Sequence, residues 1–135
     1  MVGSEEEGLY GPRGFTKPIL RLLRPYIKFR EEGEVRLKEI PWEVLKRVGK
    51  LLPPKNLEYR CGGAPKVSDF LKMGREGVKY MCYVVTSDRP DEKFVVYGIL
   101  LPREEKKLLA EVKSKALSPP THVSELGELL VLGWS

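Results

Sequence analysis

Residues Val78 to Leu101 form the stretch that most constrains the fold of this chain. They comprise two strongly apolar runs, VKYMCYVVTS and KFVVYGILL, separated by the polar sequence DRPDE. β-Branched and aromatic residues dominate both runs, and a short polar break between two such runs is typical of a β-hairpin. A half-exposed strand would alternate apolar and polar residues, whereas these runs are apolar at almost every position. We therefore expect a hairpin at the centre of a sheet, with much of both faces covered.

The remaining apolar patterns predict helices and further strands around this hairpin. Apolar residues at helical spacing, with Pro or Ser near their starts, predict helices over residues 15–24, 41–52, 68–73 and 102–116. Alternation predicts a second hairpin over residues 26–39, the apolar run 129–134 predicts a last strand, and the Pro- and Gly-rich residues 53–65 predict a loop. The sequence thus predicts one α+β domain over residues 15–135, with a mainly antiparallel sheet of about five strands and three or four helices packed on it.

The register of the second hairpin can be argued from its pattern. A two-residue loop would place Arg30 opposite Val35 and mix the polar and apolar faces. A three-residue loop with a left-handed Gly33 would pair Phe29 with Val35 and keep one face apolar. We predict the three-residue loop, which leaves the basic side chains of this hairpin on its exposed face.

Positive charge is concentrated near the N-terminus. The chain has a net charge of +5, and residues 13–30 contain six basic residues and no acidic one. Residues 1–14 contain four Gly and an acidic triplet, and we interpret them as a flexible lead-in to the domain. A hydrophobic share of 41% beside 32% charged residues excludes the disordered class, which is poor in apolar residues.

The basic residues of the first helix and the second hairpin are the strongest candidate for a functional surface. Cations neutralise phosphates and an aromatic ring stacks on a base, so this pattern predicts a nucleic-acid interface. The predicted binding residues are Lys17, Arg21, Arg24, Tyr26, Lys28, Arg30, Arg36 and Lys38. The same pattern is also typical of a solvated charged surface, and no zinc-ligand pair or aromatic RNP strand accompanies it. We expect a non-enzymatic protein that contacts the backbone of DNA or RNA.

Other residues give weaker signals for chemistry. Asp91, Glu92 and Lys93 resemble the acidic-x-Lys element of metal-dependent nucleases, but they fall at a hairpin tip, a poor platform for catalysis. A metal-dependent phosphodiesterase is therefore the less favoured alternative. His122 is the only histidine, which excludes a two-histidine metal site within the chain, and we interpret it as a loop residue. The glycines of residues 61–65 lack the ending of a P-loop. We predict neither a cofactor nor a metal.

A third interpretation is a subunit of an assembly. Apolar edge strands and an exposed Trp134 would then pair with another chain, and a homo-oligomer fits this interpretation. A dimer that is insensitive to salt and has no affinity for nucleic acid would distinguish it from the first, and light scattering would detect such a dimer.

Composition also predicts where such a protein is found. No apolar run approaches the length of a membrane span, and the acidic N-terminus is unlike a secretory signal, so we expect a cytoplasmic protein without a membrane partner. Lys, Arg and Glu are abundant, whereas Gln is absent and Asn occurs once, which resembles proteins of thermophiles, as in an archaeal cytoplasm. Cys61 and Cys82 are expected to be reduced, although a disulfide between them stays open in such organisms.

Overall fold

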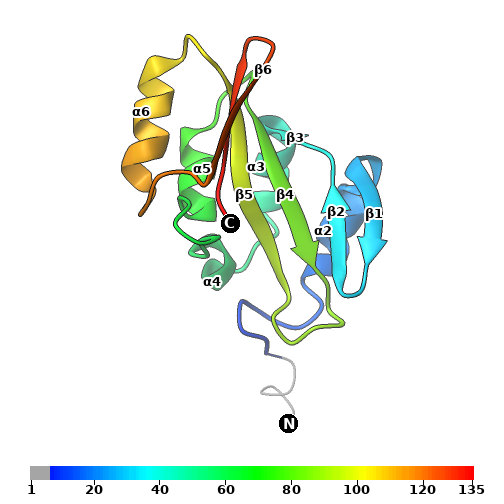
Figure 1. Cartoon of the computed structure of the whole chain (residues 1–135). Coiled ribbons are helices and arrows are strands. Elements are labelled where there is room, and N and C mark those ends of the chain that lie inside the picture. The colour runs from blue at the N-terminus through cyan, green and yellow to red at the C-terminus, as the bar shows by residue number, and fades with distance from the viewer. Residues whose placement is uncertain (1–6) are drawn as a thin grey trace.

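An antiparallel sheet of seven strands forms the frame of the molecule in the computed structural model, which describes residues 7–135 (Figure 1). The strands are β1 (Ile27–Glu31), β2 (Glu34–Leu37), β3 (Ile40–Pro41), β4 (Lys79–Val85), β5 (Lys93–Pro102), β6 (His122–Leu126) and β7 (Leu129–Gly133). The helices are α2 (Thr16–Leu22), the 3-10 helix η1 (Arg24–Tyr26), α3 (Trp42–Gly49), α4 (Pro54–Leu57), α5 (Val67–Met73) and α6 (Lys106–Lys115). The predicted α+β class is confirmed, and the predicted number of strands is too low.

The β4–β5 hairpin lies at the centre of the sheet, as the sequence predicts. The strands follow the order β1-β2-β4-β5-β7-β6, and the short β3 pairs with β4. Along β5, eight of the ten residues are buried. Cys82 and Val84 of β4 face the main hydrophobic core, whereas Tyr83 between them faces the opposite side of the sheet. The dense apolar runs therefore reflect burial on both faces.

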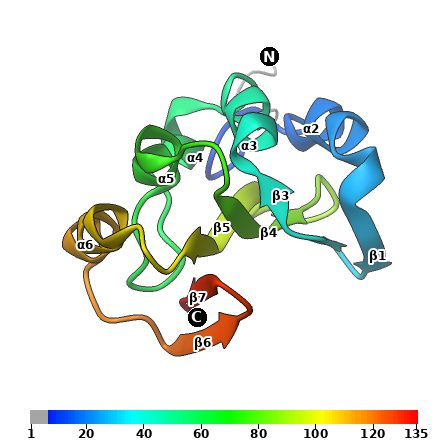
Figure 2. The same cartoon turned by 90° about the horizontal axis from the view of Figure 1, so that it is seen from above.

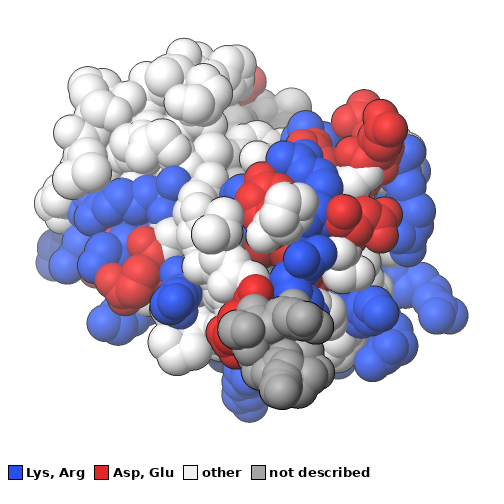
Figure 3. Space-filling view, turned by 90° about the horizontal axis from the view of Figure 1, so that it is seen from below, with Lys and Arg blue, Asp and Glu red and all other residues white. Residues whose placement is uncertain are grey.

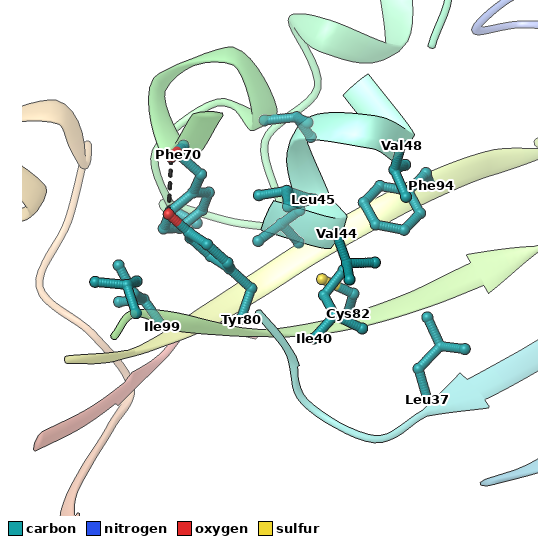
Figure 4. Packing of buried hydrophobic residues seen from close by; sticks show 14 of the residues in the cluster. Leu37, Ile40, Val44, Leu45, Val48, Phe70, Tyr80, Cys82, Phe94 and Ile99 are labelled. Atoms are coloured by element: carbon teal, nitrogen blue, oxygen red, sulfur yellow. Dashed lines mark hydrogen bonds between the residues drawn. The ribbon is translucent and has the colours of Figure 1, made fainter. Parts of the chain in front are cut away.

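Helices α2, α3, α5 and α6 form a row along one side of the sheet (Figure 2). The main core lies between this row and the sheet. Leu45 and Val48 of α3 lie close to Phe94 of β5, and the hydroxyl of Tyr80 donates a hydrogen bond of 2.9 Å to the carbonyl oxygen of Phe70 (Figure 4). This bond satisfies a buried phenol at no cost to packing. No helix in the described part of the chain is long and apolar enough to cross a membrane.

The predicted pairing of Phe29 with Val35 is wrong. Arg30 lies opposite Val35, and Glu31 lies opposite Glu34, so the β1–β2 loop has two residues. Gly33 occupies the left-handed region in this loop, with φ of 73°. The protein thus has the two-residue turn, although this turn places the polar Arg30 opposite the apolar Val35.

A β-bulge explains how the rejected turn is accommodated. The register shifts between Ile27 and Phe29, so Lys28 is the extra residue, and Ile27 still lies opposite Leu37. Leu37 therefore keeps its place in the core, while Phe29 is 50% exposed on the outer strand. The bulge keeps Ile27 opposite Leu37 despite the two-residue turn, which the sequence pattern alone did not show.

Three short elements differ from the predictions. His122, predicted in a loop, begins β6 at the edge of the sheet, and the predicted loop 53–65 contains α4. Helix α6 starts at Lys106, later than predicted, because the chain turns after Pro102. The assembly interpretation requires an exposed Trp134, but this residue is 2% exposed and donates a hydrogen bond of 3.0 Å from Nε1 to the carbonyl oxygen of Ser118. Trp134 is therefore a core residue and offers no surface to a partner.

Candidate nucleic-acid interface

Helix α2, which carries the first predicted cations, is fixed to the sheet by a buried carboxylate. Glu92, in the loop before β5, is 1% exposed. It accepts hydrogen bonds from the backbone N–H of Gly14 (2.8 Å), the backbone N–H of Thr16 (3.0 Å) and the hydroxyl of Thr16 (2.7 Å). The Nε of Arg13 lies 3.6 Å from the same carboxylate.

A negative charge at a helix N-terminus satisfies free N–H groups and is favoured by the helix dipole. Glu92 therefore sets the position of α2 from a distant part of the sequence.

Packing fixes the other side of this helix. Ile19 and Leu23 are fully buried against the core, so the residues on the opposite side of the helix point outward. Lys17 and Arg21, four residues apart, are both exposed and lie one turn apart on the same face. The helical spacing recognised in the sequence is thus confirmed by the burial pattern.

A hollow of about 270 Å³ lies where α2, η1 and β1 meet. We call it the basic hollow. Its lining residues are Lys17, Leu20, Arg21, Arg24, Ile27 and Arg30. Four of the six are cations and the other two are apolar. Within residues 7–135, none of these four cations forms an ion pair. Among the described residues, no carboxylate therefore pairs directly with the cations of the hollow.

Three other predicted binding residues lie near the basic hollow without lining it. Tyr26 is partly buried, and its carbonyl oxygen accepts a hydrogen bond of 2.8 Å from the backbone N–H of Lys38. Lys28 is exposed at the bulge of β1, and the side chain of Lys38 is exposed just after β2. These residues extend the positive charge around the hollow but do not converge on it.

Arg36 is separated from the other predicted residues by the sheet itself. Its neighbours in β2, Val35 and Leu37, face the core, so Arg36 points to the side of the sheet away from the helices. Its guanidinium lies 4.4 Å from the centre of the Tyr83 ring, and its Nη2 lies 2.6 Å from Glu34. Arg36 is thus engaged in contacts within the protein, and the eight predicted residues do not form one continuous surface.

Figure 3 shows how charge is distributed on one face of the molecule. Basic side chains gather on the side where Figure 1 places α2 and β1, and acidic side chains lie among them. Glu31 and Glu32 are exposed at the end of β1 and in the following loop. Basic side chains lie on both sides of this face with acidic side chains beside them, so positive charge is not confined to the region around the basic hollow.

The acidic residues of the β4–β5 loop are used within the protein. Asp91 accepts hydrogen bonds from Arg89 (2.8 and 3.0 Å) and from Lys93 (3.2 Å), whereas Glu92 binds the start of α2. Burial raises the pKa of Asp91, but the hydrogen bonds from Arg89 and Lys93 outweigh it and lower that pKa below its usual value. In the described part of the chain, no three His, Cys, Asp or Glu side chains are close enough to hold a metal ion. The two carboxylates face different partners.

A larger hollow, which the sequence did not reveal, lies between the end of α6 and the β6–β7 hairpin. It measures about 730 Å³, and its lining residues are Lys113, Ala116, Leu117, Ser118, Pro119, Pro120, Val123, Leu130 and Leu132. Leu117 is 72% exposed and Val123 is 58% exposed. Residues 117–120 could be recognised from sequence only as a break after a helix, because the groove depends on how β6 folds back beside them.

No protein-family model, curated protein or solved structure matches this chain. The basic hollow brings four positively charged side chains together, whereas the lining of the larger hollow has one, Lys113. Both cysteines are free thiols: Cys82 is buried in the core and Cys61 is half-buried. Burial raises the pKa of each thiol, which disfavours the reactive thiolate.

Proposed function

We propose that this protein is a non-enzymatic nucleic-acid-binding protein and that the basic hollow is the centre of its binding surface. The supporting observation is the convergence of Lys17, Arg21, Arg24 and Arg30, from α2, η1 and β1, on one hollow. Cations that bind phosphates release condensed counterions, and this release drives much of the affinity of proteins for DNA and RNA. The proposal places the phosphate backbone against these four side chains.

The electrostatics of the hollow favour an anionic ligand. Four like charges repel one another, and the described residues provide no carboxylate partner to offset this repulsion. A bound phosphate would offset it. Arginine is suited to this role because its planar guanidinium can donate two parallel hydrogen bonds to one phosphate.

The proposal can be tested with a matched pair of variants. In the first, Lys17, Arg21, Arg24 and Arg30 are changed to Ala together. In the control, Lys106, Lys107, Lys113 and Lys115, all exposed on α6, are changed to Ala. Both variants lose four positive charges, so they differ only in where the charge is lost.

We expect the wild-type protein to bind labelled single-stranded RNA or DNA with an affinity that falls steeply as salt is added. The hollow variant should bind about 100-fold more weakly, and its slope of log affinity against log salt should decrease by roughly 3, whereas the control should change less than about tenfold. Fluorescence anisotropy measures both quantities, and circular dichroism verifies that the variants are folded. Absence of binding at about 50 mM salt, or equal losses in both variants, would contradict the proposal.

The larger, apolar hollow favours a second candidate, a subunit that assembles with a second copy of itself. Strand β6 is the last strand of the sheet, so one of its sides has no strand partner, and Val123 on it is exposed beside the hollow. Light scattering distinguishes the two candidates. A dimer that persists in high salt, without affinity for nucleic acid, would favour assembly.

A further inference from the structure

We infer that the basic hollow binds a phosphate monoester on a ribose or deoxyribose, such as the phosphorylated end of a strand, rather than the internal backbone. This inference rests on the proposed function and deepens it, because it specifies which part of a nucleic acid enters the hollow. Three properties of the hollow favour such a group: the arrangement of its cations, its charge and its apolar lining.

The arrangement of the cations favours a single anionic group over an extended strand. Protein cations that follow a backbone form a track along it. Here four cations line one hollow of about 270 Å³, which is smaller than the roughly 300–1,000 Å³ of typical ligand pockets. Arg36, which would have extended a track along β2, lies on the other side of the sheet and contacts Glu34. The hollow therefore suits one compact group, not several nucleotides in a row.

Charge density favours the end of a strand over its interior. A phosphate monoester carries about −1.5 to −2 charges near pH 7, because its second pKa is about 6. An internal phosphodiester carries a single negative charge. Because several cations line the same small volume, the ligand that places the most negative charge there has the most favourable electrostatic binding energy. Three of the four cations are arginines, which bind the oxygens of a phosphate in pairs.

The apolar residues of the hollow favour a nucleotide over bare phosphate. Leu20 and Ile27 line the hollow between the cations, and both are partly buried against the core, which holds them in place. A sugar or a base edge can cover these side chains, whereas inorganic phosphate has no apolar surface to offer them. The shared chemistry is a phosphorylated sugar, and its two sources are the end of a strand and a free nucleotide.

The test compares one internally labelled RNA in three forms: with a 5′-phosphate, with a 3′-phosphate, and with hydroxyl groups at both ends. We expect one phosphorylated form to bind about tenfold more tightly than the hydroxyl form, as one or two added charge-assisted hydrogen bonds would produce. Unlabelled nucleoside monophosphate should displace that form at lower concentration than inorganic phosphate does. Fluorescence anisotropy gives each affinity.

Two variants in β1 show whether the hollow binds the phosphorylated end of the RNA. Arg30→Ala removes a cation that lines the hollow, and Lys28→Ala removes an exposed cation of β1 that does not. Arg30→Ala should reduce the tenfold preference for the phosphorylated end, whereas Lys28→Ala should weaken all three forms alike and keep the preference.

The outcomes separate this inference from the proposed function. Equal binding of the three RNA forms, with all binding lost when the four lining cations become Ala, would overturn the inference and leave the proposed function standing. Binding of the free mononucleotide but of no RNA would support the inferred chemistry and overturn the proposed function. If neither RNA nor mononucleotide binds, both are overturned.

Discussion

At the scale of single residues, Glu92 links the candidate site to the sheet. Its buried carboxylate accepts three hydrogen bonds from Gly14 and Thr16 and lies close to Arg13.

Glu92→Ala would leave these donors without an acceptor, so we expect the free energy of unfolding to fall by about 3 kcal/mol. Urea denaturation followed by circular dichroism measures the loss. Asp88→Ala, at an exposed position of the same loop, should change stability by less than about 0.5 kcal/mol, and a loss of similar size there would contradict this role of Glu92.

The role of Glu92 could not be predicted from the sequence. A carboxylate within DRPDE looks like ordinary turn composition, and its partners lie 76 and 78 residues away along the chain. The cations of α2 were found because their spacing is local and periodic. Hence the sequence identified the residues that line the hollow, but not the residue that fixes their helix in place.

At the scale of secondary-structure elements, β5 has a free edge that a side chain completes. Strand β7 pairs with β5 only from Gly98 to Pro102. Earlier along β5, the buried amide of Asn56 from α4 takes the place of a strand: its Nδ2 donates to the carbonyl oxygen of Phe94 (2.9 Å), and the N–H of Phe94 donates to its Oδ1 (2.8 Å). Both backbone groups of Phe94 are thereby satisfied where water cannot reach them.

Replacing this amide should open the edge of β5. We expect Asn56→Ala to lower the free energy of unfolding by about 2–3 kcal/mol, because two buried backbone groups lose their partners. Hydrogen exchange of the Phe94 amide should also accelerate relative to the amides paired with β4. Lys55→Ala, exposed on the same helix, serves as the control and should leave both quantities nearly unchanged. Unaltered exchange at Phe94 in Asn56→Ala would refute this account.

Elements were predictable where their pattern was long and local. The central hairpin was recognised because nearly every residue of its strands is apolar, and α2 and α3 because their apolar residues repeat with the helical period. Strand β6 was missed because four of its five residues are exposed, so its short sequence lacks an apolar face. The register of β1 and β2 depends on the bulge at Lys28, which no local rule requires.

At the scale of the whole molecule, four tyrosines make stability sensitive to alkali. Burial raises the pKa of Tyr59 to about 12, and it also raises the pKa values of Tyr80, Tyr83 and Tyr97. Phenols in the unfolded chain ionise near pH 10, so the unfolded state releases these protons first. The stabilisation from the neutral phenols is therefore complete below about pH 10 and is lost as the pH rises toward 12.

We expect alkaline unfolding to coincide with tyrosine ionisation. Circular dichroism and tyrosinate absorbance, recorded together between about pH 9 and 13, should show one shared transition for the buried phenols. Tyr59→Phe removes one ionising group and should shift the loss of structure to higher pH. The difference in tyrosinate absorbance between the wild-type protein and this variant reports the ionisation of Tyr59. If that difference appears near pH 10 while the wild-type protein is still folded, burial does not raise the pKa of Tyr59.

The dependence of α2 on Glu92 also ties the candidate site to the folding of the central hairpin. Residues 16–22 lie far from Glu92 along the chain, so the carboxylate reaches the start of α2 only when the β4–β5 turn is in place. The arrangement of the basic hollow consequently depends on a long-range contact and not only on the local sequence of α2. Nascent chains that end before Glu92 carry all four lining cations, yet they lack the means to hold them as a site.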